Sequence, residues 1–273
     1  MPGMIRAFLQ GLIVATVIAG AALAGPLEDA QAAYGRGDYA TAQTLWRPLA
    51  EQGVADAEFG LGRLFLFDSG VVKDGAQAVT WLSRAAAHGR TSVGWLLGQI
   101  YDGSLNSLGL EVVPDLAEAV RWYRVAAEGG FLAAWYQLAE HYAEGRGVAQ
   151  DFGEAIKWYR KLADVGDVFA QSQIGDFYRD GRGVPQDYAE AAKWFGEAGA
   201  WGYAYAQYQV GLLYRDGRGV RGDVVEAYKW LTLASAAADP FSGVEAERNL
   251  LAAKMTPAQI AEAQRLADAW KPK

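Results

Sequence analysis

The sequence predicts an all-α protein, a right-handed solenoid of antiparallel helix pairs with capping helices at both ends. Three observations carry this prediction. Apolar residues follow the 3.6-residue period of amphipathic helices, and glycine-rich turns separate one apolar stripe from the next. Because short helical units of this kind bury their apolar faces only against neighbouring units, the copies are expected to stack. The third observation is a repeat of 36 residues, most visible at Trp122, Trp158, Trp194 and Trp230.

The copy that spans residues 170–205 shows the repeating unit most clearly. Its first half places Ala170 and Phe177 on one helical face, and its second half does the same with Ala191 and Phe195. The intervening segment DGRGVP contains two glycines, which permit positive φ, and a proline, which blocks helix continuation. Each unit is therefore expected to be two antiparallel helices joined by a tight turn.

In each of the five repeats, an aspartate stands at the start of the second helix, and a glutamate or glutamine follows three residues later. The side chain of such an aspartate can accept from the free amides of the first turn while the later residue reaches back, which is a capping box. Paired carboxylates for acid/base catalysis are the alternative, and we disfavour it because catalysis needs one cleft and not five. The pairs are Asp74–Gln77, Asp115–Glu118, Asp151–Glu154, Asp187–Glu190 and Asp223–Glu226.

These positions together resemble the Sel1-like repeat, a relative of the tetratricopeptide repeat. The resemblance implies helix pairs whose first helices line a concave face. It also implies a scaffold or adaptor of the bacterial envelope, often acting in signalling or cell-surface assembly, with a protein partner on that face. The matching residues are Ala170, Ile174, Gly175, Tyr178, Gly181, Gly183, Val184, Asp187, Glu190, Ala191 and Trp194.

The predicted organisation has four parts. A short region with Arg6, an uncharged apolar run and the triplet Ala22-Leu23-Ala24 indicate a signal peptide cleaved after Ala24, with an uncleaved membrane anchor as the alternative. We therefore expect a periplasmic or secreted bacterial protein without membrane insertion after cleavage. The parts are residues 1–24 as signal peptide, 27–55 as N-terminal capping helix pair, 56–238 as five repeats and 239–273 as C-terminal capping helices.

Composition excludes several classes of function. Without Arg6, the chain has 24 basic and 32 acidic residues, a net charge of −8, and such a surface repels nucleic acid and anionic lipid. The sequence contains no cysteine, which excludes disulfides, thiol nucleophiles and thiolate metal sites. The two histidines, His88 and His141, lack the spacing of a zinc site, and no phosphate loop or nucleotide fingerprint is present. We expect no catalytic residue, metal or cofactor, and we expect a protein that is not an enzyme.

Residues that break the period are the candidate partner-binding residues. Trp135 fills a slot that is polar in the later copies, and Trp201, Tyr203 and Tyr205 form an aromatic junction before the fifth unit. Aromatic side chains exposed on a concave face suit a protein or glycan contact, whereas the alternative is that they fill gaps between units. The tryptophans that keep the period are instead expected in the core, and not as a sugar-stacking ladder.

An insertion of five residues in the second unit is the other irregularity. It lies within the segment GSLNSLGLEVVP at 103–114 and carries Leu105, Leu108 and Leu110. Insertions in solenoids project from one face and commonly bind partners, and the alternative is that this one folds onto its own unit. A peptidoglycan or glycan binder, or a cell-wall hydrolase, stays open as the second function, because some similar proteins carry β-lactamase labels. The chain lacks the S-x-x-K signature of those enzymes.

Overall fold

The computed structural model describes residues 25–67, 72–237 and 243–273. The described residues form helices and connecting turns, with no strand among them, which confirms the predicted all-α class. The predicted signal peptide and the boundary at 238–239 lie outside the described residues. After helical residues 25–35, the helices are α2 Tyr39–Glu51, α3 Ala55–Leu66, α4 Gly75–Ala87, α5 Val93–Tyr101, the 3-10 helix η1 Asn106–Leu108, α6 Leu116–Glu128, α7 Leu132–Glu144, α8 Phe152–Asp164, α9 Val168–Asp180, α10 Tyr188–Ala200, α11 Ala204–Asp216, α12 Val224–Ser235, α13 Val244–Ala252 and α14 Pro257–Ala269.

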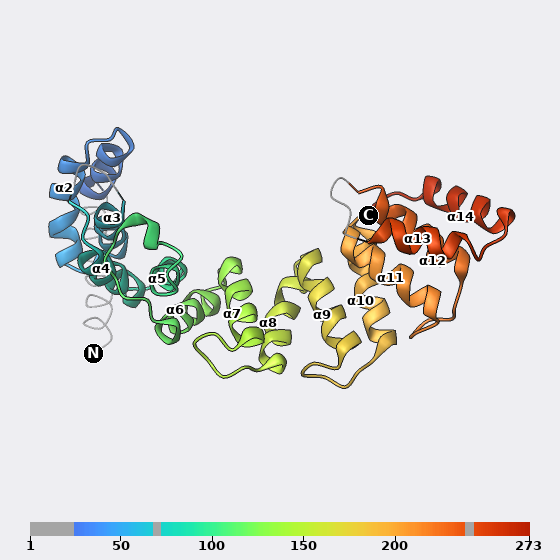
Figure 1. The fold of residues 1–273 in the computed structure, drawn as a ribbon. Coiled ribbons are helices and arrows are strands. Elements are labelled where there is room, and N and C mark those ends of the chain that lie inside the picture. Colours follow the sequence, from blue (N-terminus) through green and yellow to red (C-terminus); the bar gives the residue numbers. More distant parts are fainter. Residues whose placement is uncertain (1–24, 68–71, 238–242) are drawn as a thin grey trace, which may run out of the picture. The chain divides into compact units, whose positions relative to one another are not determined.

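The chain divides into two compact units, residues 1–134 and 135–273. In the first unit each helix from α2 to α6 packs against the next one along the chain. In the second unit the same holds from α8 to α12, and both α13 and α14 pack against α12 (Figure 1). Neighbours in sequence are therefore neighbours in space, which is the contact pattern of stacked helix pairs.

In four of the five repeats, close contact within the helix pair depends on a glycine in the first helix, and the third repeat has Ala139 at this position. A Cβ atom built on this glycine would lie within 3.0 Å of a buried side chain from the second helix, so only glycine allows the observed separation. The contacts join Gly62 to Leu82, Gly98 to Tyr123, Gly175 to Phe195 and Gly211 to Leu231.

Trp81 lies in the core as predicted, but the other four repeat tryptophans are less buried than the sequence predicted. Trp81 is 9 % exposed, but Trp122, Trp158, Trp194 and Trp230 are only half-buried. Since one residue turns a helix by about 100°, the fully buried position is the next residue along. These residues are Leu82, Tyr123, Tyr159, Phe195 and Leu231.

Cations lie over several of these partly exposed indole rings. Arg84 lies 4.6 Å from the ring centre of Trp81, Lys161 lies 4.5 Å from that of Trp158, and Lys229 lies 4.8 Å from that of Trp230. Ring faces covered in this way by cations are less available for stacking on sugars.

The five aspartates cap their helices as predicted, but the residues at N3 do not return the bond to the cap backbone. Each cap N–H instead donates to the carbonyl of an aromatic residue at the end of the preceding helix, at 2.8–3.1 Å. That carbonyl has no donor within its own helix. One hydrogen bond therefore satisfies both the last turn of the first helix and the N-cap amide of the second helix. Among the described residues, the capping box is complete at Thr256 and Gln259. The acceptors for the five caps are Phe65, Tyr101, Tyr142, Tyr178 and Tyr214.

The insertion folds back against the helices of the first compact unit, and it reaches α4, which belongs to the repeat before its own. Leu110 is 7 % exposed and belongs to the apolar core of the first unit, and Leu105 and Leu108 pack against that core. The Leu110 carbonyl lies 2.1 Å from where a Cβ of Gly75 would be, so the segment rests on the start of α4. The segment therefore folds back instead of projecting, but it rests on the preceding repeat, and the Leu110 side chain is removed from the open surface.

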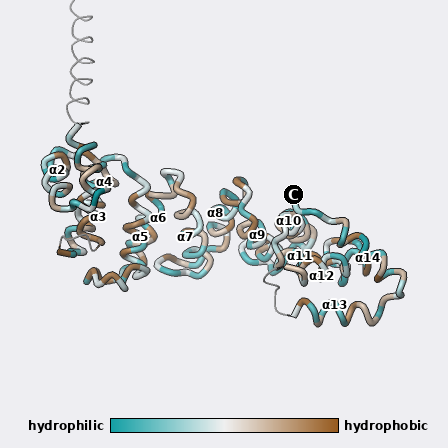
Figure 2. The backbone as a smooth tube through the Cα atoms, turned by 90° about the horizontal axis from the view of Figure 1, so that it is seen from above, coloured by the Kyte–Doolittle hydropathy of each residue, from teal (hydrophilic) through white to brown (hydrophobic). Residues whose placement is uncertain are grey.

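Hydrophobic and hydrophilic residues are interleaved along the described helices, as Figure 2 shows. In the part of the chain that the structure covers, no helix has the length and apolar character needed to cross a bilayer.

Candidate functional site

A surface rich in tyrosine lies along the first helices of the second unit. Helices α7, α9 and α11 each carry polar and aromatic residues that are half-exposed or nearly buried. Their spacing of three, four or seven residues places these side chains on one side of each helix. We call this surface the tyrosine face. Its members are Tyr136 and Glu140 on α7, Phe169, Asp176 and Arg179 on α9, Tyr205, Tyr208 and Arg215 on α11, and Tyr203 just before α11.

Contacts between helices show that these side chains form one surface. The rings of Tyr136 on α7 and Phe169 on α9 are 5.6 Å apart. The Tyr205 hydroxyl on α11 donates to Asp176 Oδ1 on α9 at 2.8 Å. Tyr203 and Tyr205 contact edge to face at 6.3 Å. Tyr136, Phe169, Tyr203 and Tyr205 thus contact one another or a neighbouring helix in the structure.

A buried carboxylate holds the middle of the tyrosine face together. Asp176 is 6 % exposed and forms an ion pair with Arg179 Nη1 at 2.7 Å, in addition to its bond from Tyr205. Arg179 also donates to both oxygens of Asp180, at 2.7 and 3.0 Å. Burial raises the pKa of Asp176, and the Tyr205 hydroxyl and Arg179 oppose this only in part. Burial likewise raises the pKa of Tyr205 to about 12, so both groups resist ionisation.

This pKa shift predicts a pH dependence of stability. Because the pKa of folded Asp176 lies above 3.8, its contribution to stability is full below that pH and is lost as pH rises through the raised pKa. We expect the unfolding free energy of wild type to fall relative to that of Asp176→Asn as the pH rises above about 4. Urea titrations at several pH values measure this difference.

Asp180 supplies a control of opposite sign. Its hydrogen bond from Arg179 lowers its pKa, so its contribution is present above 3.8 and is lost as pH falls. The unfolding free energy of wild type should therefore rise relative to that of Asp180→Asn as the pH rises. Equal pH trends for both variants would contradict the assignment of a desolvated carboxylate at Asp176.

The structure places the sequence-predicted binding residues in several settings. Tyr203 and Tyr205 belong to the tyrosine face. Trp201 lies two residues before Tyr203, at the end of α10, and is 52 % exposed. Trp135 on α7 is half-buried, with Lys161 of α8 5.5 Å from its ring. Leu110 belongs to the core of the first unit, and Leu105 and Leu108 pack against that core, so the three leucines are not part of this surface.

Sequence reasoning missed Tyr136, Asp176, Arg179 and Tyr208. Tyr136 and Tyr208 are 72 residues apart, which is twice the repeat, so the alignment of copies carried a signal for them. Arg179 and Arg215 are one repeat of 36 residues apart and carried the same signal. Asp176 gave none, because Leu212 stands at its position in the next copy and a charged residue on a helix usually faces solvent.

Both histidines are held by protein groups. His88 Nδ1 lies 2.7 Å from Glu58 Oε2, and His141 Nδ1 lies 2.7 Å from the carbonyl oxygen of Arg146. Among the described residues, no three side chains of the kinds that hold metal ions come together.

Comparison with known proteins gives one family and several similar chains. Five segments, at residues 55–89, 96–131, 133–167, 168–200 and 204–239, match the family model of the Sel1 repeat. The crystal structure of a Sel1 repeat protein from Oxalobacter formigenes is similar to 89 % of this chain and 96 % of that chain, with a TM-score of 0.55 and 29 % identity.

Two further similarities are more distant or shorter. A protective antigen present in uropathogenic Escherichia coli strains, displaying an SLR fold, matches with a TM-score of 0.47 and 26 % identity, over 91 % of this chain and 60 % of that chain. An uncharacterized protein of Neisseria meningitidis serogroup B is 34 % identical over 109 residues, which are 40 % of this chain. The aligned part spans 21 % of that curated relative.

Proposed function

Because the chain belongs to the Sel1 repeat family, as its sequence pattern predicted, we propose that it is an exported, non-enzymatic scaffold of a bacterial envelope that binds a protein partner. Sel1 repeat proteins generally act in protein–protein interaction. The binding surface in this proposal is the tyrosine face of the second unit, together with Trp201 beside it.

The observation that carries the proposal is the preorganisation of the tyrosine face. Tyrosine gives a large contact area at low entropic cost, because it has few rotatable bonds and a polar end that can bond to either partner. Here Tyr205 is already oriented by Asp176, and Tyr136 is oriented by its bond to Glu140 Oε1 at 2.8 Å. Little freedom therefore remains to be lost on binding.

Site-directed photocrosslinking tests this assignment. A photoreactive phenylalanine analogue at Tyr208 is expected to crosslink the mature protein to one envelope protein in the periplasm. The same analogue at Lys157, which is 68 % exposed on α8, serves as the control. Crosslinks to cell-wall glycan alone would instead support the glycan-binding alternative, and equal crosslinking from both positions would reject the tyrosine face.

Replacing Trp201 is expected to affect partner binding with little loss of stability. Its side chain is 52 % exposed, so Trp201→Ala should change the melting temperature by no more than about 2 °C. Loss of an exposed aromatic anchor is expected to weaken capture of the crosslinked partner about tenfold or more. Melting by circular dichroism and pull-down with the purified partner measure the two effects.

Trp135→Ala should be studied separately, because its half-buried ring lies near Lys161 and its removal disturbs packing as well. Undiminished capture by Trp201→Ala would exclude Trp201 from the interface.

A further inference from the structure

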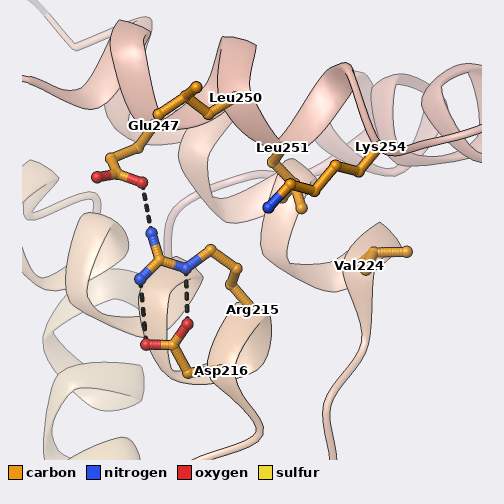
Figure 3. Close-up of a pocket in the computed structure, with 7 residues that line it drawn as sticks. All are labelled: Arg215, Asp216, Val224, Glu247, Leu250, Leu251 and Lys254. Atoms are coloured by element: carbon orange, nitrogen blue, oxygen red, sulfur yellow. Dashed lines mark hydrogen bonds and ion pairs between the residues drawn. The ribbon is translucent and has the colours of Figure 1, made fainter.

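A cavity of about 480 Å³ lies where α11, α12 and α13 meet. It is lined by the end of α11, the first residue of α12 and one side of α13 (Figure 3). All of these elements belong to the second unit. The cavity adjoins the tyrosine face through Arg215, which belongs to both.

The polar groups on one side of the cavity satisfy one another. Arg215 donates from Nε and Nη2 to the two carboxylate oxygens of Asp216, at 2.7 and 3.1 Å. Its Nη1 donates to Glu247 on α13. The guanidinium and the two carboxylates therefore form a closed ion-pair group, and Figure 3 shows this arrangement as three dashed contacts. A ligand would gain little by competing with these bonds.

The other side of the cavity is apolar apart from one cation. Leu250 is 62 % exposed, Val224 is also exposed, and Leu251 is buried at the base of α13. Lys254 lies in the turn that follows α13. Figure 3 shows its ammonium directed toward the middle of the labelled residues. Among the described residues, no hydrogen-bond or ion-pair partner of this ammonium is present.

The Lys254 side chain is exposed, and its ammonium lies beside aliphatic side chains. This combination suits a ligand that presents one carboxylate together with one aliphatic group. The C-terminal residue of a polypeptide carries both on a single Cα atom. An internal acidic residue would need a neighbouring residue for the aliphatic contact, and its chain would have to cross the cavity.

We propose that this cavity binds the C-terminus of a partner protein that ends in an aliphatic residue. The terminal carboxylate pairs with Lys254 Nζ, and the last side chain packs on Leu250, Leu251 and Val224. This inference rests on the proposed function only in taking the occupant to be a protein.

Binding of defined peptides to the purified full-length mature protein tests the inference. The probe is a fluorescein-labelled hexapeptide that ends in Val-Leu with a free carboxylate, followed by fluorescence anisotropy. Its amidated form is the matched control, and a second control ends in Ser-Gly with a free carboxylate. We expect the free Val-Leu peptide to bind about tenfold more tightly than either control, because each control lacks one of the two contacts.

Two variants show whether Lys254 binds the peptide carboxylate. Lys254→Gln is expected to reduce the difference between acid and amide to less than about twofold, since the charged partner is gone. Lys193→Gln removes an equal charge from α10, where the side chain is 66 % exposed, and should leave the difference unchanged.

Equal binding of acid and amide to the wild-type protein, or no binding of either, overturns the inference without reference to any variant. A difference between acid and amide that persists in Lys254→Gln also overturns it. None of these results bears on crosslinking at Tyr208, so this inference and the proposed function can fail separately.

Discussion

Gly219→Ala is expected to lower the unfolding free energy of the second unit by about 3–5 kcal/mol. Gly219 lies in the turn between α11 and α12 and has φ of +70°. A Cβ there would lie 2.1 Å from the backbone carbon and 2.2 Å from the oxygen of Tyr188 at the start of α10. Backbone atoms cannot move aside as a flexible side chain can, so the turn must separate from the preceding repeat. Urea denaturation followed by far-UV circular dichroism measures the loss.

Gly217→Ala is the matched control for this variant. Gly217 has φ of +63° in the same turn, but the nearest atom to its Cβ would be 3.5 Å away. It therefore carries only the cost of a left-handed alanine, about 1–2 kcal/mol. Losses of equal size in the two variants would show that backbone conformation alone matters, and that the contact with α10 does not.

Arg84→Ala is expected to lower the unfolding free energy of the first unit by about 3 kcal/mol, because it leaves a buried charge without its main partner. Glu58 on α3 is fully buried, and Arg84 Nε on α4 lies 2.9 Å from its Oε1. Arg84 also donates to the Ala50 carbonyl at 2.8 Å. Of the charged partners of Glu58 among the described residues, His88, 2.7 Å from Oε2, remains in the variant. Chemical denaturation of wild type and variant gives the difference.

A second substitution separates the charge from the lost packing. Glu58→Gln in the Arg84→Ala background removes the buried charge and should recover about half of the lost stability. Arg121→Ala is the control for an exposed ion pair: its side chain is 75 % exposed beside Glu118, and the loss should stay below about 1 kcal/mol. If the double variant is less stable than Arg84→Ala alone, Glu58 is not destabilising when unpaired, and the argument fails.

The helix pairs, their turns and their caps were predictable from the sequence because each depends on local chemistry. Periodicity of 3.6 residues specifies an amphipathic helix, and an aspartate at the N-cap accepts from amides two or three residues later. These features need no knowledge of how one helix pair contacts another.

The tertiary structure decided how each helix is rotated against its neighbours. A 36-residue period shows which residues are equivalent, but not which of two adjacent positions faces the core. Phe195 rather than Trp194 is therefore the buried residue of α10. In the same way Asp176, which reads as a solvent-facing charge, is buried by a tyrosine 29 residues later in the chain. Burial is set by contacts between residues far apart in sequence, and here those contacts built the tyrosine face and the cavity beside it.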